Sequence, residues 1–218
     1  RNITLTFLDY IKSKFAKIIT LDTEFAFNNE AMGMVKKPVC MVMKDLKSGE
    51  THKFWHYKDT QILTHCPFDY DDTLFICHYA PADVSYMMKL FWGKPPNVWD
   101  TWVEISRLYA TERSGDGGLS LLNTAKSYGV PGAMSFKDKT DFRKLIIDTC
   151  KADADFTDEE KSGVLKYCTM DVELTEQVFL NQLQDITSKS KESYETLLWQ
   201  ILFRGAAQSV VTKIQHNG

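Results

Sequence analysis

Residues 17–27 read Lys-Ile-Ile-Thr-Leu-Asp-Thr-Glu-Phe-Ala-Phe, and this stretch decides the fold. Its apolar first half predicts a buried strand, and its second half alternates polar and apolar residues. Asp22 and Glu24 are two residues apart, so both carboxylates project from the same face of that strand. Because ligands of α/β proteins gather beyond strand ends, this acidic pair indicates a site at the end of a core strand.

The rest of the chain predicts further strands and helices of an α/β fold with a mixed sheet. Strands are predicted, with the first one, at 17–27, 38–43, 51–55, 74–77 and 97–101, the last as a strand or a strand-to-helix corner. Pro81 predicts the first turn of a helix that follows the fourth strand. Thr157 and Glu160 have the spacing of a capping box at the start of another helix. Apolar periodicity predicts helices at 120–128 and from about 194 to 215.

Length and composition fit one sizeable globular domain. The chain has 218 residues, of which 44% are hydrophobic and 25% are charged, values typical of globular proteins. No apolar run is long enough to cross a bilayer, and the N-terminal residues lack the layout of a signal peptide, so no membrane association is predicted. The net charge of −3 argues against binding nucleic acid through a broad positive field. Bound divalent cations would still attract phosphate locally.

The cysteines predict free thiols. Five of them, an odd number, occur without CxxC spacing, which is typical of a protein from a reducing, intracellular compartment rather than of a disulfide scaffold. The pairs His65-Cys66 and Cys77-His78 lack the ligand spacing of a zinc finger, so buried thiols are favoured over a zinc site.

Two further acidic motifs lie far from the first in sequence. Asp83 falls in the first turn of the helix that follows the fourth strand, and Tyr167 and Asp171 are four residues apart on one helix face. Each has an ordinary alternative: Asp83 would complement the helix dipole, and Asp171 would face water while Tyr167 packs. Taken with Asp22 and Glu24, the motifs predict a cluster of hard oxygen ligands for two divalent cations, Mg²⁺ or Mn²⁺.

Such a cluster is suited to cutting phosphodiesters. Two ions about 4 Å apart hold the phosphate, one activating water and the other stabilising the leaving oxygen. Asp22 is expected to bridge both ions, Glu24 and Asp171 to complete the first, and Asp83 to support the second through water. The hydroxyl of Tyr167 is expected to orient the attacking water.

The motifs resemble those of the tyrosine (DEDDy) branch of the DEDD 3′–5′ exonucleases, from about Lys17 to Phe179. The matching stretches are Leu-Asp-Thr-Glu-Phe at 21–25, Asp-Val-Ser-Tyr-Met at 83–87, Trp-Asp-Thr at 99–101, Leu-Ser-Leu-Leu at 119–122 and Tyr-Cys-Thr-Met-Asp at 167–171. The resemblance implies a ribonuclease-H-like fold, a five-stranded mixed sheet flanked by helices. It also implies metal-dependent hydrolysis at single-stranded DNA 3′ ends by five catalytic residues: Asp22, Glu24, Asp83, Tyr167 and Asp171. Where the family usually has Asn and Phe before the second-motif Asp, this chain has Tyr79 and Ala82.

The last residues resemble the segment that joins the exonuclease to the polymerase in family A DNA polymerases. Residues 204–207 and 213–218, ending in Asn-Gly, carry this resemblance. It implies an exonuclease domain over 1–190 and a C-terminal helix over 191–218 that begins a polymerase domain. The chain would then be the proofreading part of a longer, phage-like polymerase; the alternative is a free-standing nuclease with a terminal helix. That polymerase would work as a monomer in the cytoplasm of a bacterium or phage-infected host, with an organelle left open.

Substrate preference is open. Thr23 and Phe25, next to the first acidic motif, are candidates for substrate binding, and Phe25 would stack on the terminal base; a buried core position is the commoner fate of such a Phe. The same chemistry on RNA, as in ribonuclease D relatives, is an alternative, because no residue visibly reads the 2′-hydroxyl. A second alternative is a catalytically silent nucleic-acid-binding domain of the same fold.

Overall fold

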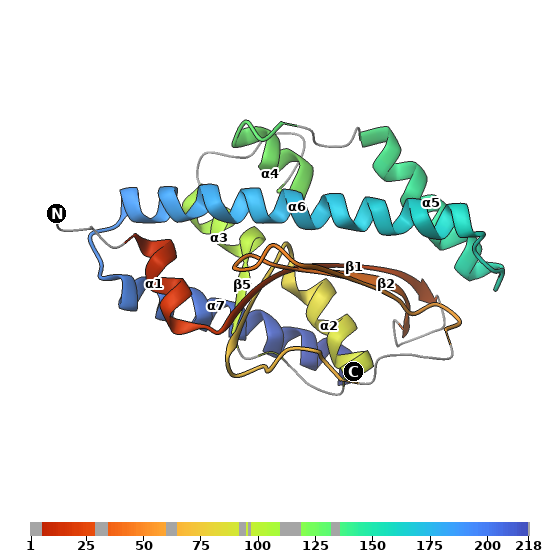
Figure 1. Ribbon diagram of the computed structural model, residues 1–218, viewed down its shortest axis with the longest axis horizontal. Coiled ribbons are helices and arrows are strands. Elements are labelled where there is room, and N and C mark those ends of the chain that lie inside the picture. The colour runs from red at the N-terminus through yellow and green to blue at the C-terminus, as the bar shows by residue number, and fades with distance from the viewer. Residues whose placement is uncertain are drawn as a thin grey trace.

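The structure is a computed structural model, and it describes residues 6–28, 35–59, 65–91, 95, 97–109, 119–131 and 136–217. Its centre is one five-stranded sheet in the order β3-β2-β1-β4-β5 (Figure 1). The strands are β1 (Lys17–Asn28), β2 (Val35–Asp45), β3 (Thr51–Trp55), β4 (Thr73–Cys77) and β5 (Val98–Asp100). β1 pairs antiparallel with β2 and parallel with β4, so the sheet is mixed. The predicted ribonuclease-H-like sheet flanked by helices is confirmed.

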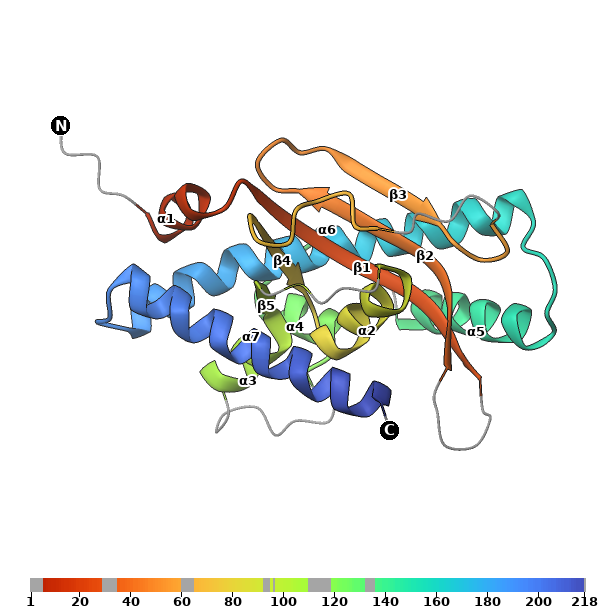
Figure 2. The same cartoon turned by 90° about the horizontal axis from the view of Figure 1, so that it is seen from below.

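Helices cover both faces of the sheet. They are α1 (Phe7–Lys14), α2 (Ala80–Phe91), α3 (Thr101–Leu108), α4 (Leu121–Ser127), α5 (Phe136–Lys151), α6 (Asp158–Lys189) and α7 (Tyr194–Asn217). The long helix α6 crosses one face of the sheet, and α2 and α7 lie on the other (Figures 1 and 2). The predicted capping box at the start of α6 is present, since Thr157 and Glu160 satisfy each other's backbone N–H groups.

The alternation of β1 divides its side chains between the two faces. Ile19 and Leu21 are buried in a core cluster with Val84 of α2. Ala26, from the opposite set of β1 positions, packs with Val164 of α6. Asp22 and Glu24 belong to the same alternating set of positions as Ala26 and therefore face α6. Thr23, which lies between them, faces α2.

Helix α7 packs on the same core as the sheet. Leu197, Leu198 and Ile201 are buried in a cluster with Trp99 of β5. At Gly205 the helix crosses β5 so closely that a Cβ atom would lie 1.9 Å from the backbone oxygen of Val98. The predicted division of the chain at residues 190 and 191 stays a prediction, and the Asn-Gly end that carries part of it includes Gly218, outside the described residues.

Two helices, α1 and α5, have no counterpart among the elements expected from sequence. β2 is also longer than predicted, spanning Val35–Asp45 instead of 38–43. Within the described ranges, no helix combines the length and the apolar character needed to cross a membrane.

Candidate active site

Asp22 and Glu24 of β1 meet Asp171 of α6. Both β1 carboxylates are partly buried beneath α6, and Asp171 is buried. Burial raises the pKa of Asp22 well above its usual value, and the charges of Asp171 and then Asp83 raise it further. Burial and next the charge of Asp22 likewise raise the pKa of Glu24. The carboxylates are thus close enough to repel one another, which a cation between them would relieve.

Asp83 approaches from the other face of the sheet. It lies in the first turn of α2 and is 3% exposed. Its Oδ1 atom accepts a hydrogen bond of 2.7 Å from the hydroxyl of Thr23. Thr23 thereby orients this carboxylate beside Asp22, while its own substrate-binding assignment stays a prediction.

The start of α2 is fixed by Asp100 at the end of β5. The Asp100 carboxylate accepts hydrogen bonds from the backbone N–H groups of Tyr79 and Ala80, and from that of Trp102 at the start of α3. Tyr79 is half exposed, with φ of +70°. This left-handed conformation suits Asn better than Tyr, which gives a backbone reason for the Asn usual in the resembling family at this motif.

Tyr167 lies one helical turn before Asp171 and is 2% exposed. Its ring stacks on that of Phe142 of α5, with centroids 5.4 Å apart and an interplanar angle of 7°. Burial raises the pKa of Tyr167, as do the charges of Glu24 and Asp171, and the phenol hydrogen-bonds with Asp171. The phenol therefore stays protonated at neutral pH, which leaves it able to donate a hydrogen bond but not to act as a base.

Lys139 of α5 is a site residue that sequence analysis missed. Its Nζ atom lies 2.8 Å from Oδ2 of Asp171 and 5.7 Å from the centroid of the Tyr167 ring. Its charge opposes the rise in the pKa of Asp22 and Glu24. Lys139 thus offsets part of the negative charge of the cluster.

Cys168 was also missed as a site residue. Its buried thiol on α6 lies 3.3 Å from both Oδ2 and the backbone oxygen of Asp22. One ligand atom from each of Asp22, Glu24 and Cys168 lies within 4.8 Å of the others. The cluster is therefore compact enough to surround one ion.

Phe25 lies on the α2 side of the sheet. It is partly buried, and its ring centroid is 6.4 Å from that of Tyr86 on α2. Packing against the core explains this position, and the stacking role of Phe25 stays a prediction.

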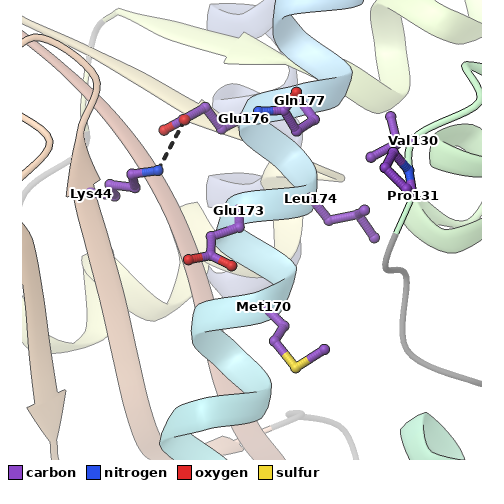
Figure 3. Close-up of a pocket in the computed structure, with 8 residues that line it drawn as sticks. All are labelled: Lys44, Val130, Pro131, Met170, Glu173, Leu174, Glu176 and Gln177. Carbon is purple, nitrogen blue, oxygen red and sulfur yellow. Dashed lines mark hydrogen bonds and ion pairs between the residues drawn. The ribbon is translucent and has the colours of Figure 1, made fainter.

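A surface pocket lies beside α6, and none of the four carboxylates of the acidic cluster lines it (Figure 3). Its lining residues are Lys44, Val130, Pro131, Met170, Glu173, Leu174, Glu176 and Gln177. Inside it, Nζ of Lys44 lies 3.0 Å from Oε1 of the buried Glu176. This ion pair joins β2 to α6, the helix that carries Asp171, so its role is structural.

The donor set fits hard divalent cations. Asp22, Glu24, Asp83 and Asp171 supply carboxylate oxygens, the ligands that Mg²⁺ and Mn²⁺ take in proteins. Burial raises the pKa of Asp22 and Glu24, and the charges of the neighbouring carboxylates raise it further. A bound cation would relieve this repulsion.

Fold and site together define an α/β protein of ribonuclease-H-like architecture with a carboxylate cluster on its central strand. Asp22 and Glu24 lie in the middle of β1, just past its pairing with β4, so the predicted position at the strand end is wrong. No family model and no curated protein matches the chain. Among solved structures, it is similar to one described as the apo form of a nuclease, with a TM-score of 0.61 and 14% identity over 96% of this chain and 89% of the other. It is also similar to NrnC of Brucella melitensis bound to pGG, with a TM-score of 0.53 and 11% identity over 92% and 85% of the two chains. At these identities the likeness establishes the fold.

Proposed function

We propose that this chain is a metal-dependent 3′–5′ exonuclease that removes nucleotides from single-stranded DNA ends. The observation that carries the proposal is the meeting of Asp22, Glu24, Asp83 and Asp171 from one strand and two helices. Random burial would not be expected to place four carboxylates together, since each must be stabilised against the others. The similar structure that is described as the apo form of a nuclease supports the same reaction class.

Each residue has a role in this reaction. Asp22, Glu24 and Asp171 would hold one cation, and Asp22 with Asp83 a second. When bound, the two cations would activate water and stabilise the departing oxygen. Tyr167, protonated and buried, would hold the attacking water by a hydrogen bond. Thr23 keeps the Asp83 carboxylate in position.

The test measures 3′-end shortening of labelled single-stranded DNA with Mg²⁺, with Mn²⁺ and with chelator. Activity should require the metal and should fall at least about 10³-fold in Asp22→Asn, because that carboxylate serves both ions. Asp141→Asn, at an exposed position of α5, is the matched control and should retain activity. Activity that survives both chelator and Asp22→Asn would refute the proposal.

DNA is proposed as the substrate from the resemblance to proofreading domains, and RNA is the alternative. Matched DNA and RNA oligonucleotides without thymine or uracil distinguish the two, because only the 2′-hydroxyl then differs between them. Faster release from RNA would reassign the chain to exoribonuclease activity. Binding without release from either would favour a silent binding domain.

The proposed larger partner is a polymerase domain of the same polypeptide. The exposed face of α7 carries large apolar side chains, and the rings of Trp199 and Phe203 stack there with centroids 5.5 Å apart. Val210 and Val211 are exposed further along the helix. Exposed apolar patches mark interaction sites, which supports a partner domain on this face of α7.

Intact mass of the protein from its natural source tests this partner. A polypeptide much longer than 218 residues is expected, and a mass matching these residues alone would contradict it.

A further inference from the structure

A sulfur atom lies inside the proposed metal site. The Cys168 thiol is fully buried, and its Sγ atom is 3.3 Å from Oδ2 of Asp22. Glu24 completes a group of three possible ligand atoms within 4.8 Å of one another. A sulfur donor among carboxylates changes which cations the group prefers, because thiolates select soft metals and carboxylates hard ones.

The spacing suits a four-coordinate ion. With Zn–S near 2.3 Å and Zn–O near 2.1 Å, tetrahedral geometry places sulfur and oxygen about 3.6 Å apart. The observed separation of Sγ and Oδ2, 3.3 Å, is close to that value. The widest separation in the group, up to 4.8 Å, requires side chains to move by about 1 Å. Mg²⁺ takes octahedral oxygen ligands and would leave the sulfur unused.

A second thiol lies behind the first. Cys40 of β2 is fully buried and hydrogen-bonds with Cys168. In the strand pairing, Cys40 lies opposite Glu24. The sulfur environment of the site therefore comes from both β2 and α6.

We propose that Cys168 determines metal specificity at this site. With Asp22 and Glu24 it binds a thiophilic divalent cation, such as Zn²⁺ or Cd²⁺, which displaces Mg²⁺ and thereby inhibits the enzyme. The inference rests on the proposed function, because the same carboxylates serve both ions. Ligation replaces the S–H bond by a sulfur–metal bond and releases one proton to solvent, with no electron transfer.

The test titrates the reduced protein with Cd²⁺ and follows the ultraviolet charge-transfer band of a cadmium–thiolate bond. The wild type should saturate at one ion per chain. Cys168→Ser should lose the band and lower Cd²⁺ affinity by at least about 10- to 100-fold, the loss that follows when a group that merely orients a ligand is removed. Cys150→Ser, at a buried thiol of α5, is the matched control and should bind as the wild type does. Added Mg²⁺ should weaken Cd²⁺ binding in the wild type.

Two further variants make the result decisive. Glu24→Gln should weaken Cd²⁺ binding while keeping the thiol, and Cys168→Ala replaces Cys168→Ser if the latter melts early. A band of wild-type strength in the Cys168 variants, or one unaffected by Glu24→Gln, would overturn the inference.

The two proposals fail separately. Cadmium binding that depends on Cys168, without Mg²⁺-dependent DNA cleavage, would keep the metal-specificity role and remove the nuclease function. Cleavage with Mg²⁺, combined with Cd²⁺ binding indifferent to Cys168, would do the reverse.

Discussion

The ammonium nitrogen of Lys139 lies 2.8 Å from Oδ2 of Asp171, and this ion pair joins α5 to α6 across the candidate site. The Asp171 side chain is nearly buried, so its charge is compensated mainly by protein groups. A bound cation and Lys139 therefore act on the same carboxylate.

Replacing Lys139 should lower the stability of the metal-free protein and increase the stabilisation that added metal provides. Lys139→Gln leaves Asp171 without its cation, which should cost about 2 kcal/mol of unfolding free energy in chelator. Added Mg²⁺ should then raise the melting temperature more in the variant than in the wild type, because the ion no longer competes with the ammonium group. Thermal melts with and without Mg²⁺ measure both effects. Lys137→Gln, at an exposed position of the same helix, is the control; equal responses in all three proteins would contradict the prediction.

Removing the Thr23 hydroxyl should leave the Asp83 carboxylate less firmly positioned for metal binding. Thr23→Val deletes the 2.7 Å hydrogen bond at nearly constant volume, so Mg²⁺ affinity should fall about tenfold. Calorimetric titration of Mg²⁺ gives the affinity. Thr23→Ser keeps the hydroxyl and should retain most of the Mg²⁺ affinity. If Thr23→Ser binds Mg²⁺ as weakly as Thr23→Val, the lost affinity is due to changed packing and not to the hydrogen bond.

Removing the Tyr167 hydroxyl should affect turnover more than binding. Tyr167→Phe keeps the ring that stacks on Phe142 and loses the hydroxyl, which hydrogen-bonds with Asp171 and is proposed to hold the attacking water. The kcat for 3′-end removal should fall about 10- to 100-fold with KM nearly unchanged. Steady-state kinetics on one oligonucleotide checks this. A loss as large as that of Asp22→Asn would show that the phenol has a different role.

Acid should destabilise the protein through His56. This imidazole is 5% exposed, its Nδ1 atom lies 2.7 Å from the Tyr86 hydroxyl, and burial lowers its pKa from 6.5 to about 4. As pH falls below 6.5, the unfolded chain gains the proton first, so stability is lost between pH 6.5 and 4.

The size of this effect is measurable against a variant that does not titrate there. Urea denaturation should show that the wild type loses on the order of 2 kcal/mol more than His56→Gln between pH 7 and 4. The comparison is needed because the raised pKa values of Asp22 and Glu24 act in the opposite direction. Parallel pH profiles for the two proteins would show that His56 does not contribute.

The crossing of α7 over β5 should tolerate only glycine. In Gly205→Ala the new Cβ atom would lie 1.9 Å from the Val98 oxygen, so the helix must move, at a cost of about 3 kcal/mol. Gly163→Ala, in α6, meets only the Phe142 ring edge at 3.1 Å. Because that ring can shift and Ala favours a helix, stability should change there by less than about 1 kcal/mol. Chemical denaturation of both variants measures these changes in unfolding free energy. Similar losses in Gly205→Ala and Gly163→Ala would contradict the prediction.

Sequence patterns predicted the sheet well because its strands are apolar segments with distinct ends. β1, β3 and β4 were located almost to the residue. The short helix α1 was missed since it offers only two turns, although Thr6 and Asp9 form a capping box that would have signalled its start. In α5, charged residues outnumber apolar ones. Its buried positions, such as Ile146 and Cys150, are therefore hard to recognise in the sequence.

The carboxylates could be found from sequence because an acid beside an apolar run is out of place. Lys139 and Cys168 carry no such signal. An isolated lysine on a charged helix is usually solvated, and a cysteine on a buried helix face usually packs as an apolar residue. Only the packing of α5 and α6 against β1 brings these two side chains to the carboxylates.

Consecutive positions of β1 serve opposite sides of the sheet: Asp22 and Glu24 meet α6, whereas Thr23 reaches Asp83 of α2. Inserting or deleting a single residue between Ile19 and Asp22 would exchange these two sets and send the acidic pair into the apolar layer under α2. Homologues of this chain should therefore differ by substitution along this strand, with length changes confined to the segments on either side of it.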